Sequence, residues 1–173
     1  PLGIAIGDIN GDGKADIATS NFGINNTASV LTNTGTGTFN TKVDYTTGTA
    51  PQGVAIGDVN GDGKADVVVA NNTATTFSVF TNNGNGTFAA KVDYTTGTGA
   101  WGIALADING DGRADAVVSN QTADTVSVFI NNGDGTFVSK VDYTTGSGPT
   151  GVALGDVSGD SKADMVVINN TAG

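Results

Sequence analysis

The chain contains no histidine, no cysteine and no glutamate among its 173 residues, so all seventeen of its acidic residues are aspartates. Without His or Cys it cannot form a disulfide, a thiol nucleophile, a Ser-His-Asp triad or a His- or Cys-ligated zinc site. Only seven Lys and Arg residues oppose the aspartates, and the formal net charge is −10. This charge argues against nucleic acid as a partner. Because groups suited to acid–base chemistry are so few, we expect no enzymatic activity.

Long apolar runs are also missing, and none approaches the ~18 residues of a membrane span. No leader sequence is visible and the chain starts at Pro1, so we expect a processed chain or a piece of a longer one. The sequence is poor in strong helix formers and contains 27 glycines, with many Thr, Val and Asn residues. This composition favours short strands joined by many turns.

One segment recurs along the whole chain. GDINGDGKAD at residues 7–16 returns as GDVNGDGKAD at 57–66, ADINGDGRAD at 106–115 and GDVSGDSKAD at 155–164. The first aspartates of these copies are separated by 50, 49 and 49 residues, and KVDYTTG recurs in the same register at Lys42, Lys91 and Lys140. We therefore divide the chain into repeats 1–50, 51–99, 100–148 and 149–173, the last of them incomplete.

Each repeat predicts four short strands. In the second repeat they are residues 53–58, 66–70, 77–81 and 91–95, with the second strand apolar throughout and the fourth alternating and charged. Four strands in ~40–50 residues is the period of a β-propeller blade, although a β-solenoid or a sandwich is the alternative. We predict an all-β chain of about three and a half blades of four antiparallel strands. The incomplete repeat would leave 164–168 as an open apolar edge, so we expect a homo-oligomer or the remainder of a longer chain as partner.

The recurring segment has the form Asp-x-Asn-x-Asp-Gly-x-x-Asp. Positions 1, 3, 5 and 9 carry side-chain oxygens, while at position 7 the basic side chain should point away and leave its backbone carbonyl as a ligand. Alternate oxygens on a tightly curled loop suit Ca²⁺, and the glycine at position 6 permits the sharp turn. The predicted ligands, for up to four Ca²⁺ per chain, are Asp8, Asn10, Asp12, Lys14 and Asp16; Asp58, Asn60, Asp62, Lys64 and Asp66; Asp107, Asn109, Asp111, Arg113 and Asp115; and Asp156, Ser158, Asp160, Lys162 and Asp164.

Two other interpretations account less well for these loops. An EF-hand needs a Glu at position 12, where this chain has Thr19, Val69, Val118 and Val167. Asp, Asn and Gly are also ordinary turn residues, but four loops with three aspartates each at fixed positions would repel strongly without a cation. The fourth loop should bind most weakly, because Ser158 replaces Asn and Ser161 replaces a glycine.

The loop, the apolar strand after it and the pattern SVF-x-NNG-x-GTF together resemble the FG-GAP/VCBS repeats of integrin α-subunit-type β-propellers. The resemblance implies a propeller whose loops hold Ca²⁺ through positions 1, 3, 5, 7 and 9. It also implies an extracellular or cell-surface structural or adhesion module, with an extracellular protein or a glycan as a possible ligand. The alternative is a calcium-dependent, lectin-like propeller, for which Trp101 could stack on a sugar or simply pack at a blade end. Asp44, Asp93 and Asp142, each beside a lysine, are expected to form exposed ion pairs on an outer strand.

Overall fold

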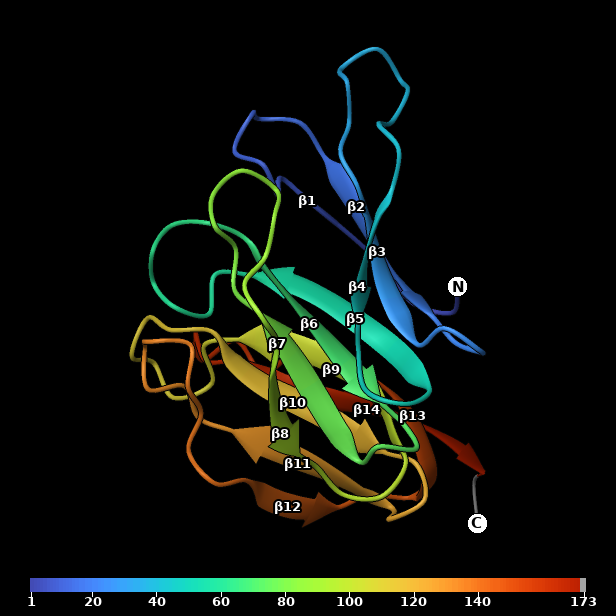
Figure 1. Ribbon diagram of the computed structural model, residues 1–173. Coiled ribbons are helices and arrows are strands. Elements are labelled where there is room, and N and C mark those ends of the chain that lie inside the picture. Colours follow the sequence, from blue (N-terminus) through green and yellow to red (C-terminus); the bar gives the residue numbers. More distant parts are fainter. Residues whose placement is uncertain (172–173) are drawn as a thin grey trace.

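The computed structural model describes residues 1–171 as β-strands joined by turns, without a helix in that range (Figure 1). The strands are β1 (Ile4–Gly7), β2 (Asp16–Asn21), β3 (Thr27–Leu31), β4 (Val43–Thr46), β5 (Pro51–Gly57), β6 (Asp66–Asn71), β7 (Thr76–Phe80), β8 (Val92–Thr95), β9 (Ala100–Ala106), β10 (Asp115–Asn120), β11 (Thr125–Phe129), β12 (Val141–Thr144), β13 (Ser147–Gly155) and β14 (Asp164–Thr171). The predicted all-β class is confirmed, and the strands of the second repeat lie within two residues of their expected bounds.

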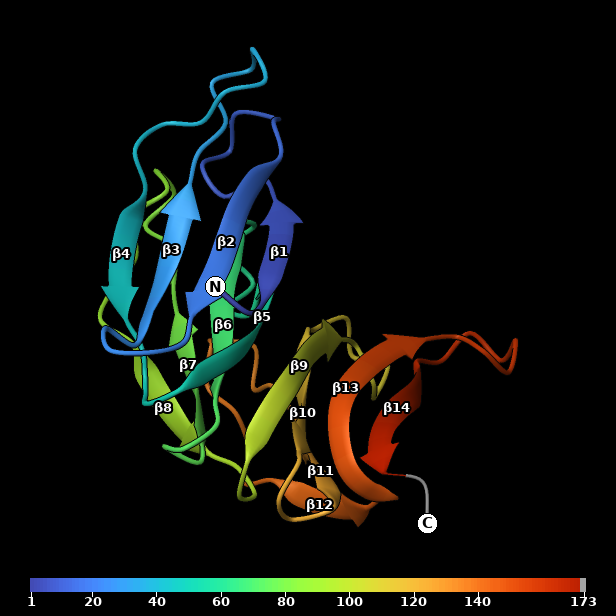
Figure 2. The ribbon, with the colours of Figure 1, turned by 90° about the vertical axis from the view of Figure 1, so that its right-hand side faces the viewer.

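The strands form three four-stranded sheets and one two-stranded sheet. Each sheet is an antiparallel meander in chain order, β1–β4, β5–β8, β9–β12 and β13–β14. The first strands of successive sheets, β1, β5, β9 and β13, pack on one another, so that the sheets are stacked face to face like blades (Figure 2). This is the partial, unclosed propeller of three full blades and one inner pair of strands that the repeat predicts.

The hydrophobic pattern of each strand explains its place in the blade. β6 and β10 are buried at all six of their positions, as their apolar sequences require for a strand covered on both faces. β4, β8 and β12 share the sequence VDYT and are mostly exposed. The second strand of a complete blade is therefore its centre and the fourth strand is its outer edge.

The core lies between the blades. Between the first and second blades, Ile9 and Val30 pack with Val67 and Phe80. Between the second and third, the Phe77 ring is fully buried, with its centroid 4.9 Å from that of Phe129. Blades are thus held together mainly by apolar burial from both sides.

Polar contacts set the register between blades. The Asn82 amide in the second blade donates to the carbonyl of Ile9 in the first at 2.6 Å, and Asn131 of the third blade donates to Val59 of the second at 2.8 Å. The Gly48 amide also donates to Asn71 at 3.1 Å. A Cβ at Gly48 would lie only 2.7 Å from the Asn71 side chain, so the close approach of the linker requires glycine there.

Candidate metal-binding loops

The Asp-rich loops connect the first and second strands of their sheets and project from one end of the blades (Figure 1). Loops of neighbouring blades lie close together. Asp58 and Asp107 line one hollow of about 330 Å³, and Asp8 lines another with Lys64. The repeat therefore gathers negative charge along one end of the molecule.

The first aspartate of each loop organises the turn. Asp58 accepts from the amides of Gly61 and Asp62 with Oδ1, at 2.7 and 3.2 Å, and from Gly63 with Oδ2 at 2.7 Å. The equivalent three bonds recur at Asp8, Asp107 and Asp156. The amide of Gly112 and its neighbours lower the pKa of Asp107, because they bond the charged form. Backbone donors thus favour the charged form of the Asp107 carboxylate.

The last aspartate of the loop is buried at the base. Asp66 is completely inaccessible; its Oδ2 accepts from the Val59 amide at 2.9 Å and its Oδ1 from the Asn82 amide at 2.8 Å. Burial raises the pKa of Asp66 despite these bonds, and the charges of Asp62 and Asp58 raise it further. Asp16 and Asp115 are equally buried and make the equivalent bonds. This carboxylate ties the loop to the strand and to the hairpin that follows.

The basic side chain at position 7 lies close to the position-5 aspartate in the first three loops. Instead of pointing away, the Lys14 ammonium lies 2.9 Å from the Asp12 carboxylate, and Lys64 lies 3.3 Å from Asp62. Arg113 reaches Asp111 at 3.9 Å. The lysine stems pass over glycines of the following hairpin, so the position-5 carboxylate attracts a cation held in place by packing.

The donor chemistry of the loops fits a hard cation, since each offers three carboxylates, an amide or hydroxyl oxygen and a backbone carbonyl. Within residues 1–171, however, no three acidic side chains converge into a group that could hold a metal. Their oxygens accept instead from loop amides and position-7 cations. The predicted ligands of each loop therefore share one short turn, but hydrogen bonds occupy many of their side-chain oxygens.

The fourth loop shows the strain expected of Ser161. Its φ is 67°, in the left-handed region, where Gly13, Gly63 and Gly112 have φ of 79°, 79° and 82°. A serine in this region is less favourable than glycine. The structure confirms that Ser161 occupies a glycine-type position.

With this geometry established, the chain can be compared with known proteins. The profile of the FG-GAP-like repeat family matches residues 8–69, 58–118 and 116–167. The chain belongs to the FG-GAP-like repeat family. This membership confirms the resemblance drawn from the loop and the hairpin pattern.

Two solved structures share the FG-GAP repeat chain's fold. An Agrocybe aegerita lectin, described as recognising non-reducing terminal N-acetylglucosamine, is 23% identical with a TM-score of 0.58 over 96% of this chain. The Photorhabdus luminescens Tc holotoxin pore is 20% identical with a TM-score of 0.54 over 95% of this chain. The chain spans 42% of the former and 8% of the latter. The comparison with curated proteins found no match.

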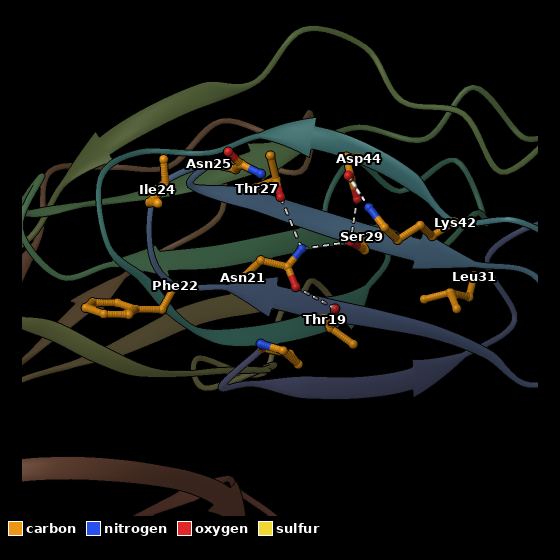
Figure 3. A pocket seen from close by; sticks show the side chains of 11 residues that line it. Thr19, Asn21, Phe22, Ile24, Asn25, Thr27, Ser29, Leu31, Lys42 and Asp44 are labelled. Atoms are coloured by element: carbon orange, nitrogen blue, oxygen red, sulfur yellow. Dashed lines mark hydrogen bonds and ion pairs between the residues drawn. The ribbon is translucent and has the colours of Figure 1, made fainter.

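A series of hydrogen-bonded polar side chains crosses each complete blade, and the sequence predicted only its Asp–Lys pair. The expected pair of Lys42 and Asp44 is present and exposed, but Asp44 also accepts from the Ser29 hydroxyl, to which the Asn21 amide donates at 2.7 Å (Figure 3). The same Asn–Ser–Asp–Lys series crosses the next two blades. Its signal in the sequence is the recurrence of Ser29, Ser78 and Ser127 eight, seven and seven residues after Asn21, Asn71 and Asn120.

Trp101 lies within β9 and is half-buried. It lines a hollow of about 250 Å³ with Leu2, Gln52 and Thr150, all on or beside the first strands of blades.

No helix among the described residues is long and apolar enough to cross a membrane.

Proposed function

We propose that this FG-GAP repeat chain is a calcium-binding structural or adhesion module that works outside the cell. The observation that carries the proposal is the fourfold repetition of one loop, with the same three amide bonds to its first aspartate each time. Ca²⁺ would be held by the side chains at positions 1, 3, 5 and 9 and the carbonyl at position 7. Calcium abundance outside cells suits the modest affinity of such exposed loops.

The charge distribution supports this proposal. Burial raises the pKa of Asp66, and the charges of Asp62 and Asp58 raise it further, so the loop carries a buried charge and a repulsion that its own amides do not remove. The ion pair of Lys64 and Asp62 leaves both side chains at least a third exposed, and such surface pairs contribute little. A divalent cation would offset the remaining negative charge far more effectively.

The test is thermal unfolding with Ca²⁺, with Mg²⁺ and with excess chelator. A ligand at a hundredfold excess over its Kd adds about 2.7 kcal/mol per site, so several occupied loops would raise the melting temperature markedly. Asp58→Asn should reduce the number of Ca²⁺ bound in calorimetry. The matched control Asp134→Asn changes an exposed aspartate outside the loops and should leave that number unchanged. Equal melting temperatures with Ca²⁺ and with chelator would contradict the proposal.

Calcium-dependent glycan binding is the second candidate. It is favoured by the fold shared with a lectin and by a hollow of about 370 Å³ between the second and third blades. Tyr94 lines this hollow together with Asp93 and Lys140, and the largely buried rings of Phe129 and Phe137 border it from the core. A glycan array probed with and without Ca²⁺ tests it, and Phe137→Ala should abolish any hits. An array without hits under both conditions would contradict glycan binding and leave the structural or adhesion role as the only candidate.

A further inference from the structure

The first and fourth sheets each present one uncovered face. The head face is the side of the first sheet turned away from the second blade, and it contains Ile4, Ile6 and Asn33. The tail face is the side of the β13–β14 pair and its loop turned away from the third blade, and it contains Val157, Val166 and Ile168. Figure 2 shows these two sheets at opposite ends of the stack.

Residues of the head face are exposed where their counterparts are covered. Ile4 is 64% exposed, whereas Val54 and Ile103 at the same position of the next two blades are 9% and 8% exposed. Ile6 is 66% exposed, although its counterparts Ile56 and Leu105 pack against a preceding blade. The head face therefore carries the same apolar residues that, in the second and third blades, are covered by the preceding blade.

The tail face shows the complementary pattern. Val157 is 72% exposed, whereas Ile9 and Val59 at its position are each 1% exposed. Val166 is 51% exposed, and its counterparts, which include Val68, are completely buried. These are the positions that meet a following blade.

A polar contact is divided between the same two faces. Asn82 donates both to Ala65 in its own blade and to Ile9 in the blade before it, and Asn131 does the same with Ala114 and Val59. Asn33 makes the bond within its own blade, to Ala15 at 3.1 Å, but has no preceding blade among the described residues. The carbonyl of Val157 corresponds to the missing acceptor.

We propose that the tail face of one copy of this chain packs against the head face of a second copy, with Asn33 donating to Val157 of that copy. The occupant is a second copy because the two faces carry the two halves of one internal interface, in both apolar and polar groups. The contact joins unlike faces, so it builds a closed ring or an open row of copies. The proposal deepens the assembly aspect of the proposed function and does not require a glycan ligand.

Ile168 distinguishes the tail face from the internal interfaces. Its counterparts Ser20, Ala70 and Ser119 are small and fully buried, and the Ser20 hydroxyl contacts the Gln52 carbonyl of the next blade. The larger side chain should hinder the approach of a second copy. Ile168→Ala should therefore strengthen association, and weaker association would show that the contact does not follow the internal geometry.

The experiment measures mass by light scattering in saturating Ca²⁺ over a range of concentrations. The unaltered chain should form multiples of 17.1 kDa. Ile6→Asp on the head face and Val166→Asp on the tail face should each give 17.1 kDa particles, and their equimolar mixture should form a 1:1 complex because one good head and one good tail remain. Asn33→Ala should weaken association about fivefold to tenfold. The matched control is Val92→Asp, because Val92 is 52% exposed like its counterparts in the other complete blades.

Three outcomes would overturn the proposal: a monomeric unaltered chain, single variants that still associate, or a mixture that remains monomeric. If a head face bound another head face, or a tail face another tail face, one of the single variants would still associate. Far-UV circular dichroism confirms that each variant is folded, and Asn33→Ala supplies a test without a charge in an apolar surface. Calcium calorimetry on the monomeric variants separates the proposals, since intact Ca²⁺ binding would preserve the proposed function even if assembly failed.

Discussion

Replacing Asp66 with asparagine tests whether the buried aspartate supports the fold without a metal. In the unaltered chain the two carboxylate oxygens of Asp66 accept from the amides of Val59 and Asn82 at 2.9 and 2.8 Å. Asparagine has nearly the same volume, but its NH₂ group is a donor and replaces one of these two acceptors. One buried amide then lacks an acceptor, at a cost of about 1–3 kcal/mol, and the other bond loses its charge assistance. Removal of the buried charge, and with it the repulsion from Asp62 and Asp58, offsets part of this loss. We expect a net destabilisation of about 2–3 kcal/mol.

The assay is thermal unfolding in excess chelator, so that any metal contribution is absent. For a chain of this length, 1 kcal/mol corresponds to about 2–4 °C, which predicts a decrease of roughly 4–12 °C for Asp66→Asn. Asp164→Asn is the matched control, because its partners, the amides of Val157 and Ser158, lie at exposed positions where water can replace the carboxylate. Its effect should be below about 1 kcal/mol.

A melting temperature of Asp66→Asn equal to or above that of the unaltered chain in chelator would refute this reasoning. It would mean that removing the buried charge gains as much as the lost bonds, and that Asp66 serves the loop only as a ligand. An equal decrease at Asp66 and Asp164 would also contradict it, since burial is the difference between the two sites.

Three other predictions concern the core, the fourth loop and the tyrosines. Phe77→Ala should destabilise the chain by about 3–5 kcal/mol in denaturant titration, because the ring is fully buried between blades; a loss below 1 kcal/mol would show that the interface collapses around the cavity. Ser161→Gly should raise stability slightly and tighten Ca²⁺ binding at the fourth loop, since φ there is 67°; calorimetry without any gain would count against it. Burial raises the pKa of Tyr45 and of Tyr94, so their contribution to stability is complete below about pH 10 and lost as pH rises through the folded-state pKa values. Absorbance titration at high pH should show late ionisation of Tyr45 and Tyr94, and ordinary ionisation of these two side chains would contradict the prediction.

The repeat, the four strands per blade and the place of the Asp-rich loops could all be predicted from the amino-acid sequence. These features depend on short-range patterns: the apolar run of β6, the alternation in β8 and the glycines of the turns act over a few residues each. The glycine-type conformation of Ser161 was predictable for the same reason, because the residues at the same position of the other three loops are glycines. The family resemblance summarised the same local patterns.

Contacts between residues far apart in the sequence depend on how the blades pack, and the local patterns do not reveal them. Asn82 and Ile9 lie 73 positions apart, and their bond exists because two blades stack with a particular register. The return of Lys14 to Asp12 depends on the packing of its stem over Gly35, which no spacing within the loop reveals. The exposure of Ile6 and Val166 likewise depends on which faces remain uncovered, since the same residue types are buried elsewhere in the repeat. The sequence repeat specifies the strands and turns of each blade, whereas the stacking of the blades determines which groups of neighbouring blades come into contact.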